Sequence, residues 1–226
     1  MDAIIVSSPK LRESSPHLAP HRERVHVIPF GIDIEKYGRL EPIPLKRNAE
    51  DVRILFVGRL SRYKGIDVLL RAMRGVPGRL RLVGDGPLKN EIRSFIDSEK
   101  TLQQRVDLLG QVSEEQLIEE YHNADLFVLS STDAGEAFGY VLIEAMAGRN
   151  AVISTELNTG TSWVNQHGET GLVVEANSVS GLQDALLKLL NDHDLRHKMQ
   201  ESAYNRTVKH FDIQRMLDEN EQVIIT

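Results

Sequence analysis

The chain has 226 residues, of which 41% are hydrophobic and 27% are charged, and it contains 16 glycines and 8 prolines. This composition is typical of a folded globular protein of one or two domains and excludes collagen-like and disordered chains. A net charge of −6 argues against nucleic acid as a main partner, and the absence of cysteine excludes disulfides, thiolate nucleophiles and zinc–cysteine sites.

The first 50 residues differ in pattern from the rest of the chain. Residues 2–8 and 25–29 are predicted to be strands, separated by a polar stretch that contains proline, and residues 39–50 are predicted to be a linker. No signal-peptide pattern opens the chain and no apolar run approaches 18 residues, so neither an export signal nor a membrane span is expected. We expect residues 1–50 to be the edge of a preceding domain with its linker, and residues 51–226 to form the main domain.

From residue 53 onward, short apolar runs rich in β-branched residues alternate with helical patterns. Such runs are typical of strands that are buried on both faces of a sheet. Six strands are predicted, at residues 53–57, 80–83, 105–109, 125–129, 151–154 and 171–174.

Helices are predicted between these strands and after the last of them. Pro87 suits a first helical position, and Ser113 with Gln116 forms a capping-box pattern. The alternation implies right-handed crossovers and a Rossmann-like, doubly wound parallel sheet, in which ligands bind beyond the carboxyl ends of the strands. The predicted helices span residues 65–74, 87–100, 113–123, 140–147, 178–190, 194–210 and 212–224.

The loop after the first of these six strands contains Gly58, Arg59 and Lys64. A glycine at a strand end lets the backbone approach a ligand closely, and two cations beside a helix start favour an anion, most naturally a phosphate. When the loop is taken alone, a solvated turn with two surface cations is the better interpretation of the pattern.

The next two loops are less informative. Gly84 opens the sequence Gly-Asp-Gly-Pro, which is also an ordinary strand-to-helix turn. Backbone groups of Gly110 and Val112 can border the edge of a flat base, but a plain turn accounts for them as well.

The loop after the fourth strand carries Glu136 and runs into a helix that carries Glu144. We expect both carboxylates to face one ligand at the sheet's carboxyl edge, where they can accept hydrogen bonds from the vicinal hydroxyls of a ribose or a hexose. Backbone amides from Gly139 to Leu142, with Tyr140 and Val141 between them, would meet a pyrophosphate at the helix start. This combination points to a nucleotide-sugar, whereas two surface glutamates beside a helix remain the simpler alternative.

No metal site is expected. Asp192 and Asp194 match an Asp-x-Asp pattern, but they lie in a polar joint between two predicted helices, where helix capping is the better interpretation. The eight histidines, at positions 17, 21, 26, 122, 167, 193, 197 and 210, form no convincing ligand set.

Taken in order, these motifs resemble the C-terminal half of GT-B glycosyltransferases of family 4. A narrower similarity to bacterial O-antigen mannosyltransferases depends on Ser8-Pro9, Ser15-Pro16 and residues 161–165. The motifs that carry the family resemblance are residues 27–33, 56–60 with Lys64-Gly65, 84–87, 108–110, 124–125, 136–147 and 170–173.

The resemblance implies retaining transfer from a nucleotide-sugar donor, without a metal or other cofactor. The family pattern would place Arg59 and Lys64 on the diphosphate, Glu136 on the donor sugar and Glu144 on the ribose. These residues are the predicted catalytic set, apart from Glu144, which joins the donor-binding set. The other predicted donor-binding residues are Gly58, Gly84, Gly110, Val112, Phe138, Gly139, Tyr140, Val141 and Leu142.

The resemblance also implies an acceptor-binding domain before this chain, a glycan or lipid-linked acceptor, and a cytoplasmic location with peripheral contact at the inner face of the membrane. The isolated chain would then bind a donor but transfer nothing. A non-catalytic or regulatory nucleotide-sugar module and a GT-B epimerase remain alternatives. One departure from the family stands after Ala147, where Gly148-Arg149-Asn150-Ala151-Val152 replaces the usual Cys-Gly-x-Pro-Val, so Arg149 occupies a glycine position near the sheet edge.

Overall fold

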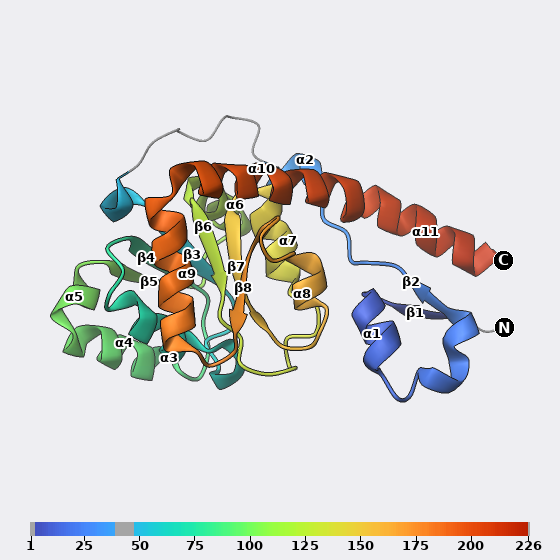
Figure 1. The fold of residues 1–226 in the computed structure, drawn as a ribbon, viewed down its shortest axis with the longest axis horizontal. Helices are drawn as coiled ribbons and strands as arrows, with labels where there is room; N and C mark the ends of the chain where they lie inside the picture. The colour runs from blue at the N-terminus through green and yellow to red at the C-terminus, as the bar shows by residue number, and fades with distance from the viewer. Residues whose placement is uncertain (1–2, 39–47, 226) are drawn as a thin grey trace.

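The computed structural model describes residues 3–38 and 48–225, and its main feature is a six-stranded sheet in which every pair of neighbours is parallel (Figure 1). The strand order is β5-β4-β3-β6-β7-β8. All six strands arise within two residues of where the sequence predicts them. The predicted Rossmann-like, doubly wound fold is confirmed.

The strands of this sheet are β3 (Arg53–Val57), β4 (Arg79–Val83), β5 (Val106–Gly110), β6 (Leu126–Leu129), β7 (Ala151–Glu156) and β8 (Gly171–Glu175). The helices after residue 48 are η2 (Ala49–Asp51), η3 (Arg62–Lys64), α3 (Ile66–Met73), α4 (Lys89–Ser98), α5 (Lys100–Gln103), α6 (Glu114–Asn123), α7 (Tyr140–Ala147), α8 (Thr161–Val164), α9 (Val179–Asn191), α10 (His193–His210) and α11 (Ile213–Ile225).

Helix boundaries show where the sequence was informative. The capping box at Ser113 and Gln116 is present at the start of α6. The single helix predicted over residues 87–100 was wrong: α4 starts at Lys89, and extended backbone at Glu99 separates it from α5. Continuous helical propensity hid that break, because only local backbone geometry reveals it.

Two hydrophobic clusters cover the two faces of the sheet. Successive residues of a strand point to opposite faces, so Ile54 of β3 joins the cluster under α3 and α9, while its neighbour Leu55 joins the cluster under α6 and α7. The same alternation separates Val128 from Phe127 in β6. Burial on both faces explains why β6 is apolar throughout and β3 is apolar after Arg53.

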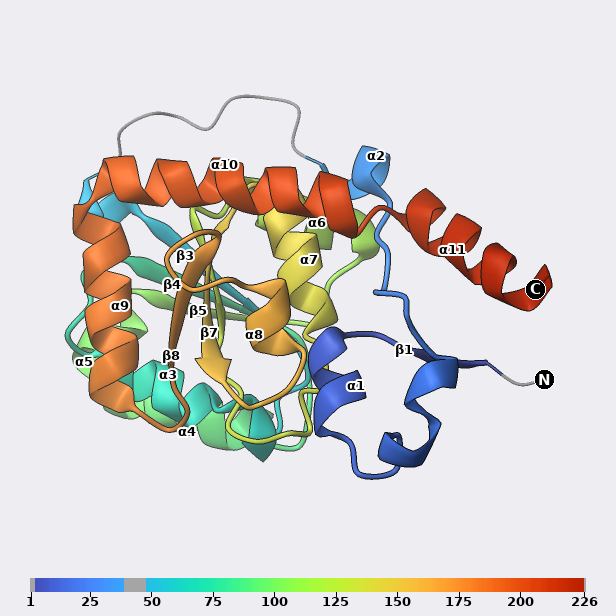
Figure 2. The same cartoon turned by 45° about the vertical axis from the view of Figure 1, so that its right-hand side comes forward.

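Residues 3–38 lie beside the sheet rather than in it (Figure 2). Strands β1 (Ile4–Val6) and β2 (Val25–Val27) lie within the two segments that the sequence predicts to be strands, and they form their own two-stranded parallel sheet. The polar stretch between them folds into α1 (Pro9–Ser14) and η1 (Ala19–Arg24), and α2 (Ile34–Tyr37) follows β2. Residues 39–47 of the predicted linker lie outside the described residues, and the boundary at residues 50–51 stays a prediction.

Helix α10 crosses the amino edge of the sheet (Figure 1), where it contacts Arg149 in the turn before β7. Arg149 has a left-handed backbone, with φ of 58°. Its guanidinium forms an ion pair with Glu201 and lies 3.8 Å from the centre of the Tyr204 ring. These contacts hold an arginine in a conformation that favours glycine, on the edge of the sheet opposite the predicted site.

We expect Arg149→Gly to be more stable than Arg149→Ala by about 1 kcal/mol, because both variants lose the same contacts but only alanine keeps the left-handed strain. Urea denaturation of the two variants measures this difference. Equal stabilities would show that φ at this position costs nothing.

Among the described residues, no helix combines the length and the apolar character that a membrane span requires.

Candidate functional site

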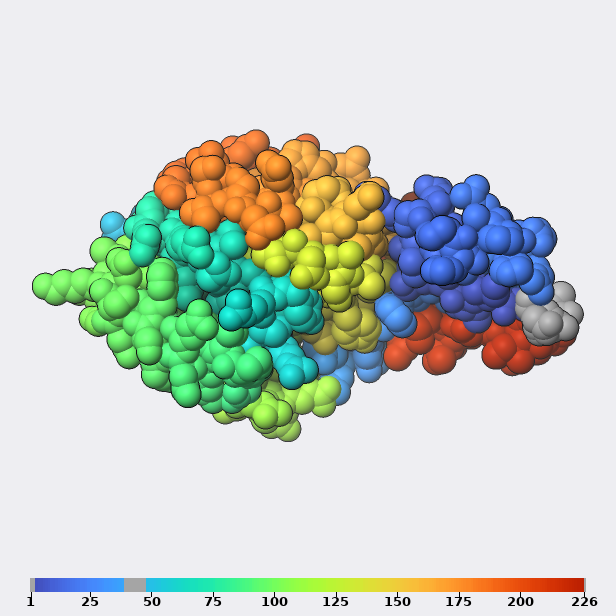
Figure 3. All heavy atoms as spheres, turned by 90° about the horizontal axis from the view of Figure 1, so that it is seen from below, coloured from blue at the N-terminus to red at the C-terminus, as the bar shows by residue number. Residues whose placement is uncertain are grey.

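The order of the strands reverses between β3 and β6, the two central strands of the sheet. In doubly wound sheets this switch point opens a crevice at the carboxyl ends of the strands, where ligands bind. The loops that follow β3 and β6 meet there, and Figure 3 views the molecule from this side. These are the two loops in which the sequence places Arg59, Lys64 and Glu136.

Three predicted glycines form a row across the carboxyl ends of β3, β4 and β5. The amide of Gly58 donates to Val83 O at 3.0 Å, and the amide of Gly84 donates to Gly110 O at 2.8 Å. A Cβ atom at Gly84 would lie 1.9 Å from the Gly58 carbonyl oxygen, so only glycine fits there. The row therefore presents bare backbone at the edge of the predicted site.

The loops after β3 and β6 are tied together at Gly65. This residue has a φ of 62°, and a Cβ on it would lie 2.1 Å from Ser130 O. The Ser130 hydroxyl donates to the carbonyl oxygen of Lys64 at 2.9 Å, and the Thr132 amide donates to Tyr63 O at 2.7 Å. Close backbone packing thus fixes Lys64 against the loop that carries Glu136.

Lys64 and Glu136 form a buried ion pair across the switch point. Their exposed fractions are 7% and 9%, and the ammonium group of Lys64 donates to Oε2 of Glu136. The hydroxyl of Ser131 donates to the same carboxylate oxygen at 3.1 Å, and the Lys64 ammonium lies 5.2 Å from the centre of the Tyr63 ring. Two predicted catalytic residues that are 72 positions apart are therefore in direct contact.

Arg59 differs from Lys64 in its surroundings. It is exposed, and no described residue accepts a hydrogen bond from its guanidinium. It follows Gly58 directly, so its position at the carboxyl end of β3 places a positive charge beside the glycine row. Such a group can form a bidentate contact with a phosphate without breaking an internal ion pair.

The start of α7 offers backbone donors to the same crevice. Gly139 is its N-cap, with φ of 79°, and no side chain caps the helix. The Leu142 amide donates to Gly139 O at 2.8 Å, whereas no described residue accepts from the amides of Gly139, Tyr140 and Val141. Three of the four predicted amides are thus available to an anion.

The side chains near the start of α7 pack against the interior of the protein. Phe138 is 4% exposed and its ring meets Phe30 edge-on, with ring centres 5.0 Å apart. Leu142 is fully buried, and Val141 and Val112 pack against the same core cluster. Phe138, Val141 and Leu142 can therefore contact a nucleotide-sugar only through their backbone groups.

Tyr140 links the helix start to the N-terminal part of the chain. Its hydroxyl donates to Gly31 O at 3.0 Å. Gly31 in turn packs so closely on the turn between α10 and α11 that a Cβ would lie 2.5 Å from the Cα atom of Ile213. The side chain of Tyr140 thus connects the site to the segment before α2 rather than facing the crevice alone.

Glu144 lies one turn further along α7 and is 8% exposed. Its Oε2 accepts a hydrogen bond from the hydroxyl of Tyr121 at 2.7 Å. Burial raises the pKa of Glu144, and the hydrogen bond from Tyr121 opposes that rise. Burial and the Glu144 charge also raise the pKa of Tyr37, to about 12, so this phenol stays protonated at neutral pH.

Glu136 and Glu144 share no hydrogen-bond partner among the described residues, since each carboxylate accepts from a different hydroxyl group. Ser131 and Tyr121, the two hydroxyl donors to these carboxylates, were missed by the sequence reasoning. Ser131 stands five residues before Glu136 within the same polar loop, which was a usable signal. Tyr121 occupies an ordinary apolar position of α6, so the sequence gave no signal of its contact with Glu144.

We expect Glu144→Gln to be more stable than the native chain at pH 7. Because its pKa is raised by folding, the native glutamate loses stability as the pH rises through the ordinary glutamate pKa toward the folded value, and glutamine removes that loss while keeping an acceptor for Tyr121. Thermal unfolding from pH 4 to pH 8 measures the difference, which should vanish at the acid end. A constant difference would contradict the titration of Glu144.

Within residues 3–38 and 48–225, no group of three His, Asp or Glu side chains is placed to hold a metal ion. Asp192 instead caps α10, with its carboxylate accepting the amide of Leu195 at 2.9 Å. The capping interpretation of Asp192 is confirmed.

Comparisons with known proteins agree with this architecture. The family model described as glycosyl transferases group 1 matches residues 40–206. The chain is 33% identical over 193 residues to D-rhamnosyltransferase WbpZ of Pseudomonas aeruginosa, covering 82% of this chain and 49% of the relative. It is 29% identical over 220 residues to O-antigen chain mannosyltransferase C of Escherichia coli, covering 96% and 59%.

Among solved structures, Anabaena Alr3699/HepE in complex with UDP superposes with a TM-score of 0.84 at 20% identity, over 98% of this chain and 63% of that one. This likeness concerns the fold alone. The chain spans roughly half of the two curated relatives named above, at 49% and 59% of their lengths. The match to the family model shows that the chain belongs to the glycosyl transferases group 1 family, and its Rossmann-like fold is that of GT-B glycosyltransferases.

Proposed function

We propose that this chain is the donor-binding half of a retaining glycosyltransferase that uses a nucleotide-sugar. The observation that carries the proposal is that three features follow β3 and β6, the two strands at the switch point of the sheet. An exposed Arg59 follows the glycine row, the start of α7 has free amides, and the buried carboxylate of Glu144 lies one turn into that helix. A molecule with a diphosphate beside a ribose suits this arrangement.

Each part of the site has a proposed partner on the donor. Arg59 and the amides of α7 bind the diphosphate and stabilise the negative charge that grows on the leaving group. Glu144 accepts hydrogen bonds from the ribose hydroxyls. The base lies along Gly110 and Val112.

The Lys64–Glu136 pair has a double role in this proposal. Its position between the two loops places it beside the bond that breaks, with Lys64 toward the diphosphate and Glu136 toward the donor sugar. Because the two side chains already hold each other, the site keeps its charges in place before a donor arrives.

The donor is proposed to be GDP-mannose and the acceptor a glycan or a lipid-linked glycan. The name of the Escherichia coli relative, O-antigen chain mannosyltransferase C, supports the sugar and the acceptor class. The rhamnosyltransferase relative supports a hexose or deoxyhexose donor more generally. Transfer without a metal, a cytoplasmic location and contact with the inner face of the membrane complete the proposal.

We also propose that a second domain, outside this chain, binds the acceptor, because the relatives are about twice as long. Helix α11 supports this proposal, since none of its residues is buried and Leu217 is 50% exposed. Other large hydrophobic side chains are exposed in the N-terminal segment and in α11, at Ile5, Leu11, Phe30, Ile213, Ile224 and Ile225. A surface of this kind marks a site for protein contact, so we expect no sugar transfer by the isolated chain.

Calorimetric titration with GDP and with UDP tests the donor site. We expect the native chain to bind one of them, and Glu144→Gln to bind it about tenfold more weakly, because a charged acceptor for the ribose is lost. Since Glu144→Gln should be the more stable protein at pH 7, weaker binding cannot be ascribed to unfolding. No binding by the native chain, or equal binding by the variant, would reject the proposed site.

A further inference from the structure

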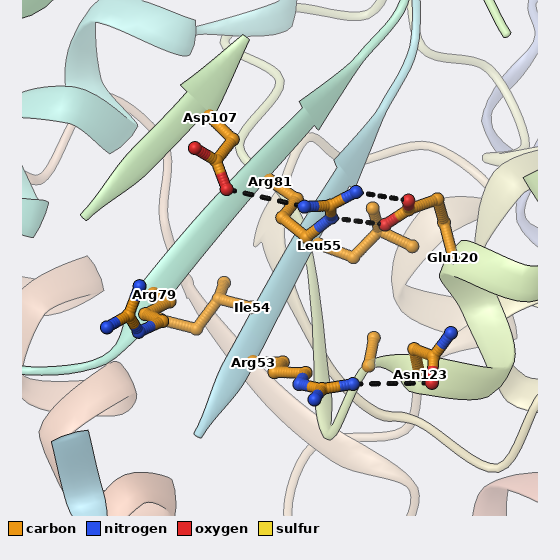
Figure 4. Close-up of a pocket in the computed structure, with 9 residues that line it drawn as sticks. Arg53, Ile54, Leu55, Arg79, Arg81, Asp107, Glu120 and Asn123 are labelled. Carbon is orange, nitrogen blue, oxygen red and sulfur yellow. Dashed lines mark hydrogen bonds and ion pairs between the residues drawn. The ribbon is translucent and has the colours of Figure 1, made fainter. Parts of the chain in front are cut away.

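A second cavity, of about 340 Å³, lies at the edge of the sheet opposite the donor site (Figure 4). Arg53 and Arg79, the first residues of β3 and β4, line it together with Ile54 and Leu55. The glycine row is at the other end of the same strands, roughly 13 Å away for a five-residue strand. The two sites therefore have no residue in common.

The two carboxylates that line this cavity, Asp107 and Glu120, share one cation, Arg81. The guanidinium of Arg81 donates through Nε to Glu120 at 2.6 Å and through Nη2 to its other oxygen, and it also donates to Asp107 at 3.3 Å. Figure 4 shows Arg81 between these two acidic side chains. The three arginines and two carboxylates of the lining leave a net charge of +1, and neither Arg53 nor Arg79 forms an ion pair with a lining carboxylate.

Arg53 and Arg79 are partners in register on neighbouring parallel strands, so their side chains start from the same face of the sheet, on strands that are about 4.8 Å apart. Arg53 donates to the neutral amide oxygen of Asn123 at 3.3 Å, and its backbone amide donates to Asp125. Within the described part of the chain, the guanidinium of Arg79 has no acceptor. Like charges directly opposite each other destabilise a sheet unless an anion lies between them.

We propose that this cavity binds a phosphate dianion, either free or as the terminal phosphate of a lipid headgroup. The planar forks of Arg53 and Arg79 match the oxygens of a phosphate. Figure 4 shows the two guanidinium groups directed apart, so these exposed side chains would turn toward each other to bind it from two sides. Asn123 orients Arg53 and adds an amide donor. Buried Ile54 and Leu55 exclude water from one side, which strengthens the contact, and the cavity leaves room for the group that carries the phosphate.

Titration of the isotope-labelled chain with inorganic phosphate, followed by NMR, tests the site. We expect saturable shifts of the amides of residues 53, 79 and 123, and at least a tenfold loss of affinity in the double variant R53Q/R79Q. The control R71Q removes an exposed arginine of α3 that pairs with Asp67 and should leave the affinity unchanged. Phosphate should also raise the Tm of the native chain more than that of R53Q/R79Q, whose two positions are exposed.

Vesicles of phosphatidic acid, with phosphatidylcholine vesicles as the control, separate the two sources of the phosphate. Sedimentation with phosphatidic acid that R53Q/R79Q abolishes identifies a lipid headgroup, and its absence, with phosphate binding retained, identifies a free phosphate. Shifts confined to the glycine row and the start of α7, or equal losses in R71Q and R53Q/R79Q, would overturn the proposal. Nucleotide binding by R53Q/R79Q should stay native, so this result is independent of the donor-site test.

Discussion

Lys64→Met is expected to lower the free energy of unfolding by about 3–5 kcal/mol, because it leaves Glu136 buried without its cation. The hydroxyl of Ser131 would be the only donor that the described residues still offer to that carboxylate. Methionine keeps the length and apolar stem of lysine, so packing contributes little to the loss. Urea denaturation at pH 7 measures it.

Two further variants separate the ion pair from other causes. The double variant Lys64→Met/Glu136→Gln should recover most of the loss, since it removes both buried charges. Lys36→Met breaks the exposed ion pair with Glu114 and should cost about 0–1 kcal/mol. If Lys64→Met costs no more than Lys36→Met, the pair at the switch point is not a buried one in solution.

The sequence predicts the sheet well because the central strands β3 and β6 are buried on both faces along most of their length. Neighbours such as Ile54 and Leu55 are both apolar because each packs into a different cluster. The resulting apolar runs differ clearly from the helical patterns between them. The break at Glu99 escaped prediction because the residues on both sides of it favour a helix. No sequence pattern indicates the left-handed backbone at Arg149, since its contacts with Glu201 and Tyr204 form only in the folded chain.

The sequence predicted which residues belong to the site and which loops carry them. It did not predict which of these side chains contact each other. Lys64 and Glu136 were each placed at a strand end, but their contact depends on the order in which β3 and β6 lie in the sheet. Glu144 was expected to face a ligand, whereas its bond to Tyr121 depends on how α6 packs on α7. Such pairings are set by tertiary packing, which spacing along the chain does not encode.

This difference changes which residue can test the phosphate contact. Judged from the sequence alone, Lys64 is as good a probe of the phosphate contact as Arg59. In the structure, removal of Lys64 also disturbs Glu136. Arg59 is exposed and has no acceptor for its side chain among the described residues. Its replacement therefore changes the charge of the crevice with little effect on folding.

Arg59→Ala is expected to weaken the binding of GDP or UDP by about tenfold to a hundredfold, which is the value of one charged hydrogen-bonding contact of 1.5–3 kcal/mol. The affinity for the matching nucleoside should stay unchanged, because a nucleoside has no phosphate for the guanidinium to contact. Calorimetric titrations of nucleotide and nucleoside, at a fixed salt concentration, give the two ratios.

Arg71→Ala is the matched control, since it removes an exposed arginine in the last turn of α3 that pairs with Asp67. If it weakens nucleotide binding as much as Arg59→Ala does, the effect reflects net charge rather than contact. If Arg59→Ala weakens nucleoside and nucleotide equally, Arg59 contacts the base or the ribose. The diphosphate would then have to be held by the start of α7 and the ion pair at the switch point.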